Sequence, residues 1–130
     1  MFGPRRGERS PPPATWGGVD AKRLSRLPRA EVGGVCFPVA IDRRAQLLGL
    51  AGLSRERARS GLLLPGCACV HTFWMRFALD LYFLDHRGGL LGARLAVPPR
   101  RLVHLRGAAM VLERPAAQSG ESAPVLAWGA

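Results

Sequence analysis

Residues 61–85 read GLLLPGCACVHTFWMRFALDLYFLD and hold most of the aromatic side chains and two of the three cysteines in one apolar run. After the turn pair Pro65-Gly66, residues 67–77 are rich in β-branched and aromatic residues and poor in helix formers, which predicts a strand. Residues 79–85 predict a second strand by the same pattern. The run therefore indicates neighbouring extended segments that share one apolar core.

Downstream of this run, the sequence predicts a hairpin and a further strand. Gly88 and Gly89 allow a tight reversal, so residues 90–97 should pair with residues 79–85 before Pro98 stops them. Residues 108–113 form another apolar segment, and Pro115 should end it because proline cannot donate to a central ladder.

Upstream, residues 35–41 predict an edge strand because they contain Pro38. Asp42 can cap a short helix over residues 43–50, which Gly49 should shorten. Residues 54–60 are polar and predict a loop that holds at most one helical turn.

These elements predict a mainly β fold, a compact antiparallel sandwich or barrel-like domain with one or two short helices. Residues 1–30 are rich in arginine, proline and glycine and lack an apolar period, so we expect a disordered tail. Residues 31–118 form the expected β domain. Residues 119–130 form a C-terminal segment that could supply a final strand.

The chain has 130 residues and a net charge of +10, which invites a nucleic-acid interpretation. Residues 1–30 carry a net of +5, however, and the remaining arginines are scattered, so we expect no nucleic-acid partner unless the tail supplies one. No apolar run is long enough to span a membrane, and no hydrophobic segment follows the basic N-terminus. We expect a cytoplasmic monomer with free thiols.

Cys67, Cys69 and His71 alternate, so on a strand they would share one face and could present soft ligands to a metal. Structural zinc sites take four ligands, however, and no second cysteine pair exists. A catalytic thiol would need a lowered pKa, and the sequence places no helix N-terminus beside either cysteine. We assign no metal and no cofactor, and we expect buried thiols.

On a regular strand, Phe73 and Met75 would share the face of His71 and belong to the core. Trp74 and Arg76 would lie on the opposite face. An aromatic plane beside a guanidinium suits stacking and contacts with anions or sugars, although the two could equally form a packing pair at the rim.

Asp80 and Glu113 stand inside apolar segments, where a carboxylate must find hydrogen-bond donors or a cation. The simpler interpretation is structural, with Asp80 bonded to backbone amides or to Arg76. The functional alternative is an acid or base in a cleft, and two facing carboxylates could run acid/base hydrolysis.

The central motif resembles the domain-of-unknown-function-192 family, also called UPF0127, and most closely its short, signal-free bacterial members. The resemblance runs from about Val35 to Ala117 and implies an antiparallel β-sandwich-like domain with a small helical segment and no established activity. Ala78 stands where the family usually has proline, and the C-terminal end also departs from the family pattern. The segments that carry the resemblance are Leu48-Gly49-Leu50, Gly61-Leu62-Leu63-Leu64 with Cys67, Val70-His71-Thr72-Phe73-Trp74-Met75-Arg76-Phe77, Leu79-Asp80, Phe83-Leu84-Asp85, Val111-Leu112-Glu113 and Pro115-Ala116.

The sequence favours a small binding or accessory module for a polar ligand or a protein partner, with a cleft edged by His71, Trp74, Arg76 and Asp80. The alternative is a small hydrolase or lyase that acts on a polar or carbohydrate substrate, with Asp80 or Glu113 as acid/base and His71 assisting.

Overall fold

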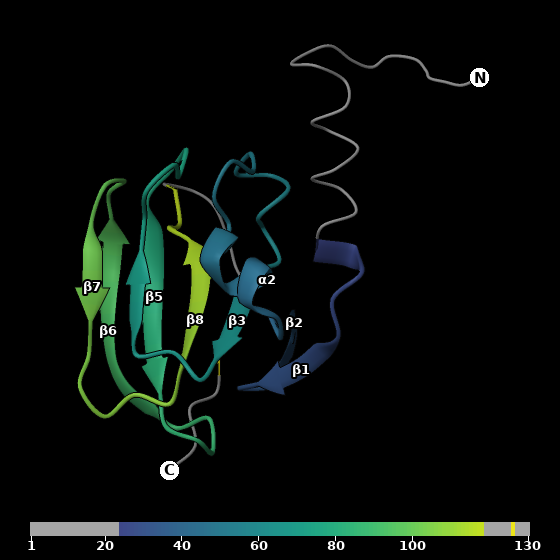
Figure 1. The fold of residues 1–130 in the computed structure, drawn as a ribbon, viewed down its shortest axis with the longest axis vertical. Helices are drawn as coiled ribbons and strands as arrows, with labels where there is room; N and C mark the ends of the chain where they lie inside the picture. Colours follow the sequence, from purple (N-terminus) through teal and green to yellow (C-terminus); the bar gives the residue numbers. More distant parts are fainter. Residues whose placement is uncertain (1–23, 119–125, 127–130) are drawn as a thin grey trace.

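A computed structural model of the chain describes residues 24–118 and Leu126, and its architecture is mainly β (Figure 1). The described strands form a four-stranded antiparallel sheet of order β3-β8-β5-β6 and two smaller pairs, β1-β2 and β4-β7. Within the described residues these sheets do not close into a barrel. The elements are β1 (Arg29–Val32), β2 (Val35–Pro38), α2 (Arg43–Leu48), β3 (Leu62–Pro65), β4 (Cys69–His71), β5 (Leu79–Leu84), β6 (Leu90–Val97), β7 (Leu102–His104) and β8 (Met110–Pro115).

The predicted hairpin is confirmed. β5 and β6 pair in antiparallel register, and the turn between them is closed by Asp85, whose carboxylate accepts hydrogen bonds of 2.8 Å from the backbone N–H groups of Arg87 and Gly89. These two bonds, that from Gly89 first, lower the pKa of Asp85. The turn is thus held by a side chain as well as by its glycines.

The short helix is also confirmed, and its ends follow the expected chemistry. Asp42 accepts a hydrogen bond of 2.7 Å from the N–H of Ala45, as an N-cap residue should. The helix ends at Leu48, because Gly49 takes a φ of +53°, a left-handed conformation that favours glycine. In Figure 1 this helix lies over the side of the sheet formed by β3 and β8.

Strands β3, β8 and β5 of the four-stranded sheet are packed on both faces, whereas β6 is largely exposed. Odd-numbered residues of β5 and β8, such as Leu81 and Val111, belong to the larger core cluster, which also contains Leu50. Even-numbered residues, such as Leu112, belong to a second cluster with Phe37 of the β1-β2 hairpin. Because side chains alternate along a strand, Glu113 falls on the face of the larger cluster.

The predicted strand over residues 67–77 is wrong for most of its length. β4 covers only Cys69–His71, and the chain then turns at Phe73 and Trp74. The turn forms because Thr72 is fully buried and uses its backbone and hydroxyl groups to bond the backbone of Pro98 and Arg101. These bonds end the extended conformation that the residue types favour.

Three strands were not predicted, namely β1, β3 and β7. The structure also describes part of the expected tail: residues 1–23 lie outside the described residues, whereas Leu24 is buried and β1 begins at Arg29. Of the expected C-terminal segment 119–130, the structure describes Leu126 alone, which packs against the second cluster.

Candidate ligand pocket

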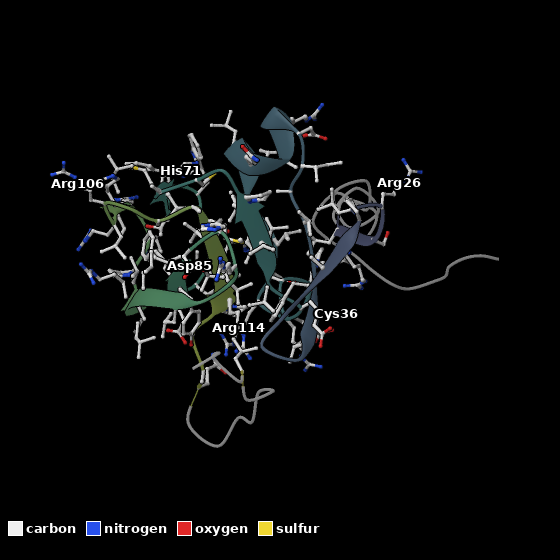
Figure 2. All side chains as sticks on the ribbon, turned by 90° about the horizontal axis from the view of Figure 1, so that it is seen from below. Arg26, Cys36, His71, Asp85, Arg106 and Arg114 are labelled. Atoms are coloured by element: carbon white, nitrogen blue, oxygen red, sulfur yellow. The ribbon has the colours of Figure 1, made fainter. Side chains whose placement is uncertain are left out.

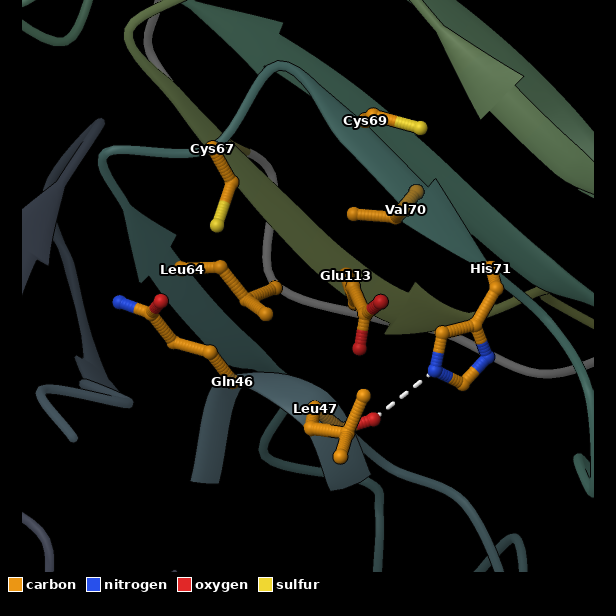
Figure 3. A pocket seen from close by; sticks show the side chains of 8 residues that line it. All are labelled: Gln46, Leu47, Leu64, Cys67, Cys69, Val70, His71 and Glu113. Atoms are coloured by element: carbon orange, nitrogen blue, oxygen red, sulfur yellow. Dashed lines mark hydrogen bonds between the residues drawn. The ribbon is translucent and has the colours of Figure 1, made fainter. Parts of the chain in front are cut away.

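A pocket of about 230 Å³ lies where α2 meets β3, β4 and β8 (Figure 3). Its walls are mostly apolar, and its polar groups come from α2, from β4 with the residues just before it, and from β8. Two of the sequence candidates, His71 and Glu113, line it together. The lining residues are Gln46, Leu47, Leu64, Cys67, Cys69, Val70, His71 and Glu113.

Glu113 is the most unusual of these residues, because its carboxyl group is nearly inaccessible and its side chain is only 2% exposed. Its strand is central in the sheet, and its cross-strand neighbours are Leu62 on one side and Leu81 on the other. Its Oε1 atom has no hydrogen-bond partner among the described residues. A buried polar atom without a partner is uncommon and costs free energy.

Burial in this apolar layer raises the pKa of Glu113 to about 8, and a hydrogen bond from the backbone N–H of Leu50 opposes the rise only in part. Desolvation dominates because no cation of the described part of the chain pairs with the carboxylate. At neutral pH the side chain is therefore mainly a neutral acid, which can both donate and accept a hydrogen bond.

Gly49 provides the space that the carboxyl group occupies. A Cβ atom on Gly49 would lie 3.0 Å from Glu113 Oε1, and the φ of +53° at this position is strained for any other residue type. The glycine that ends α2 is thus also the residue that admits Glu113 beneath the helix.

His71 forms one side of the pocket and is fixed at both ring nitrogens. Its Nε2 donates to the carbonyl oxygen of Leu47 at 2.8 Å, and its Nδ1 accepts from the backbone N–H of Phe73 at 3.2 Å. This pair of bonds selects the neutral tautomer with the proton on Nε2. The ring joins α2 to the turn after β4 and has no free nitrogen for proton transfer.

Cys67 and Cys69 also line the pocket, but their thiols differ. Figure 3 shows the Cys67 sulfur pointing into the pocket and the Cys69 sulfur pointing away from Glu113. Burial first, and then the nearby Glu113 and Cys69, raise the pKa of the Cys67 thiol, which disfavours the nucleophilic thiolate. Cys69 is exposed, whereas the sequence predicts a buried thiol.

No three His, Cys, Asp or Glu side chains among the described residues are grouped so that they could hold a metal ion.

Asp80 lies on the other face of the sheet. Its register partner is Arg114, whereas Glu113 pairs with Leu81, so the two carboxylates point in opposite directions. The carboxylate of Asp80 accepts a 2.8 Å hydrogen bond from the backbone N–H of Ala96, as the structural interpretation requires. Asp80 and Glu113 therefore do not form a facing pair.

The remaining candidates stand on the turn after β4. Met75 is buried, as predicted, but Phe73 is 43% exposed, and its assignment to the core is wrong because the turn breaks the alternation of a regular strand. Trp74 is 75% exposed, and its ring lies 5.9 Å from that of His71. Arg76 is exposed on the same turn. Trp74 thus adjoins the pocket, whereas Asp80 does not.

Among the described residues, no arginine or lysine lines this pocket. Figure 2 shows Arg26, Arg106 and Arg114 at well-separated edges of the molecule. In the same part of the chain, no helix combines the length and apolar character needed to cross a bilayer.

Two solved structures share the fold of this chain. One is a protein of unknown function from Novosphingobium aromaticivorans DSM 12444, with a TM-score of 0.52, 19% sequence identity, and coverage of 68% of this chain and 70% of that one. The other comes from Sinorhizobium meliloti 1021 and is described as a "putative transcription regulator"; its TM-score is 0.56, its identity 21%, and the coverage is 68% of this chain and 78% of that one. At such identities the likeness concerns the fold alone.

No curated protein has a sequence that matches this one. The model of the DUF192 family, described as "Uncharacterized ACR", matches residues 29–122. The matched region begins with β1 and includes every described strand, together with the motif of residues 70–77. The chain therefore belongs to the DUF192 family.

Proposed function

We propose that this domain binds a small molecule whose head group enters the pocket and donates a hydrogen bond to Glu113 Oε1. The observation that carries the proposal is that this atom is buried and has no partner among the described residues, while the Glu113 side chain lines the pocket. A ligand that supplies a donor would relieve an unsatisfied group, whose desolvation costs about 1–3 kcal/mol.

Several features of the pocket favour binding over catalysis. Both nitrogens of His71 are engaged by the backbone, so the ring cannot move a proton without breaking a structural bond. The thiol of Cys67 has a raised pKa. A hydrolytic pair of Asp80 and Glu113 finds no support, because the two point to opposite faces of the sheet.

Two kinds of head group share the required chemistry. A neutral amide can donate to the carbonyl oxygen of the protonated acid, whereas an ammonium group would pair with the ionised carboxylate. Since the pKa of Glu113 is about 8, only the second kind needs the protein to lose a proton. The affinity for an amine should then rise about tenfold per pH unit up to about pH 8, and the affinity for an amide should not rise.

The test uses acetamide and methylamine as probes, with ligand-observed NMR on the full chain between pH 6 and pH 8. Glu113→Leu should abolish the binding of both, and Glu113→Gln should keep acetamide and lose methylamine. Glu31→Gln is the matched control, because Glu31 is an exposed residue of β1. Equal binding by the wild type and Glu113→Leu would refute the proposal.

A further inference from the structure

We propose that Phe73 and Trp74, here called the aromatic lip, stack on a planar ring of the ligand whose head group reaches Glu113. This inference rests on the proposed function and adds the class of ligand: an aromatic or heteroaromatic ring that carries an amide or amine. Four observations lead to it.

The first observation is the conformation of Trp74. Its φ is +64°, in the left-handed region that bulky residues rarely adopt, and its side chain is 75% exposed. Strained backbone of this kind persists only where the surrounding structure enforces it, and it concentrates at functional sites. A left-handed backbone disfavours a bulky residue, and water disfavours an exposed apolar ring. Neither factor therefore explains why a tryptophan stands at this position.

The second observation is that the turn is firmly held at both ends. The Thr72 hydroxyl donates to Pro98 O and accepts from Arg101 N–H, each at 2.8 Å. Beyond the lip, Met75 is buried, and the carbonyl of Trp74 accepts a hydrogen bond of 3.0 Å from Gly52 N–H. The exposed rings therefore stand on a fixed support.

The third observation is that the aromatic lip is continuous with the pocket wall. The His71 ring lies 5.8 Å from that of Phe73 and 5.9 Å from that of Trp74, and His71 itself lines the pocket. Leu47, which accepts the His71 hydrogen bond, also lines the pocket and is 65% exposed. Figure 3 shows the Glu113 carboxyl group pointing toward the gap between Leu47 and His71.

The fourth observation is the size of the pocket. Its volume of about 230 Å³ lies below the roughly 300–1,000 Å³ of pockets that enclose a drug-sized ligand. A head group fits inside, and the rest of a larger ligand must lie over the rim. The two exposed aromatic rings lie next to His71 of the pocket wall, and such rings favour a planar partner in offset or edge-to-face contact.

The experiment compares benzamide with cyclohexanecarboxamide, two probes that share a head group and differ in the planarity of the ring. Trp16→Phe and Trp128→Phe leave Trp74 as the sole tryptophan of the full chain, so its fluorescence reports the contact directly. In this background, benzamide should bind about threefold to tenfold more tightly than cyclohexanecarboxamide and should change the emission of Trp74.

Trp74→Asn is the test variant, because asparagine tolerates a left-handed backbone, and Phe73→Leu is a second. With binding followed by ligand-observed NMR, both variants should reduce the preference for benzamide and leave the affinity for acetamide unchanged. The inference is overturned if the wild type shows no preference for benzamide over cyclohexanecarboxamide, or if Trp74→Asn keeps that preference.

The outcomes separate this inference from the proposed function. Acetamide binding that depends on Glu113, without any preference for a planar ring, overturns the aromatic lip alone. Acetamide binding that does not depend on Glu113 overturns both. Emission from Trp74 that responds to protein concentration and not to benzamide would make the aromatic lip a contact between copies, which also overturns the inference.

Discussion

Replacing Glu113 by glutamine should remove most of a pH dependence of stability that this one side chain creates. Burial raises the Glu113 pKa from 4.5 to about 8, and each pKa unit is worth about 1.4 kcal/mol. Below pH 4.5, both the folded and the unfolded chain hold the proton. Between pH 4.5 and about 8, only the unfolded chain loses it, so the free energy of unfolding falls as pH rises, by roughly 5 kcal/mol across the window.

Urea unfolding between pH 5 and pH 9 measures this effect. Between pH 5 and pH 8, the free energy of unfolding should fall by roughly 4 kcal/mol more for the wild type than for Glu113→Gln. Above about pH 8, the two plots of this free energy against pH should become parallel. Glu31→Gln, on exposed β1, should keep the wild-type slope. Identical profiles for the wild type and Glu113→Gln would refute the argument that Glu113 is buried as a neutral acid.

Gly49→Ala should destabilise the fold by more than Gly52→Ala, because both glycines have positive φ but only a Cβ at Gly49 would approach Glu113 Oε1, at 3.0 Å. Thermal unfolding should show a difference of about 1 kcal/mol or more, and equal losses would contradict the close packing of α2 on the carboxyl group. Cys67 should react with iodoacetamide more slowly than exposed Cys69 at pH 8, and Glu113→Gln should accelerate the reaction of Cys67. At this pH the Glu113 carboxyl group is about half ionised, and the substitution removes that partial negative charge, which helps to raise the thiol pKa. Peptide mass spectrometry gives both rates, and equal rates at the two cysteines would count against the buried thiol.

The parts of the fold that the sequence predicts well are those decided by local chemistry. Asp42 indicates where α2 begins and Gly49 where it ends, because a capping side chain and a glycine with positive φ each act within one turn of the chain. The β5-β6 hairpin is equally local, because Asp85 and Gly89 close it with their own hydrogen bonds.

The turn after β4 was mispredicted because its cause is distant in sequence. Residue types in 67–77 favour a strand, but the hydrogen bonds of Thr72 to Pro98 and Arg101 end it. β3 was missed for another reason: Leu62, Leu63 and Leu64 are all buried, and a strand covered on both faces shows no alternation.

The sequence predicts only some of the residues that line the pocket. Glu113 stood out as a carboxylate in an apolar segment, yet the neighbours that desolvate it, Leu62 and Leu81, belong to other strands. Gln46 and Leu47 were not anticipated, because a six-residue helix gives no sign of which strand it covers. Gly49 was the available signal for this part of the pocket. It ends the helix, and because it has no side chain it also leaves room for that of Glu113.

The most direct measurement of the central claim is the carbon-13 NMR titration of the Glu113 carboxyl group between pH 4 and pH 10. Buried in the pocket without a cation, this group should titrate with a midpoint near 8 in the free protein. Addition of methylamine should lower the midpoint, because the ammonium group stabilises the carboxylate. A midpoint near 4.5 in the free protein would contradict the account, because it would show that the carboxyl group is hydrated or already paired.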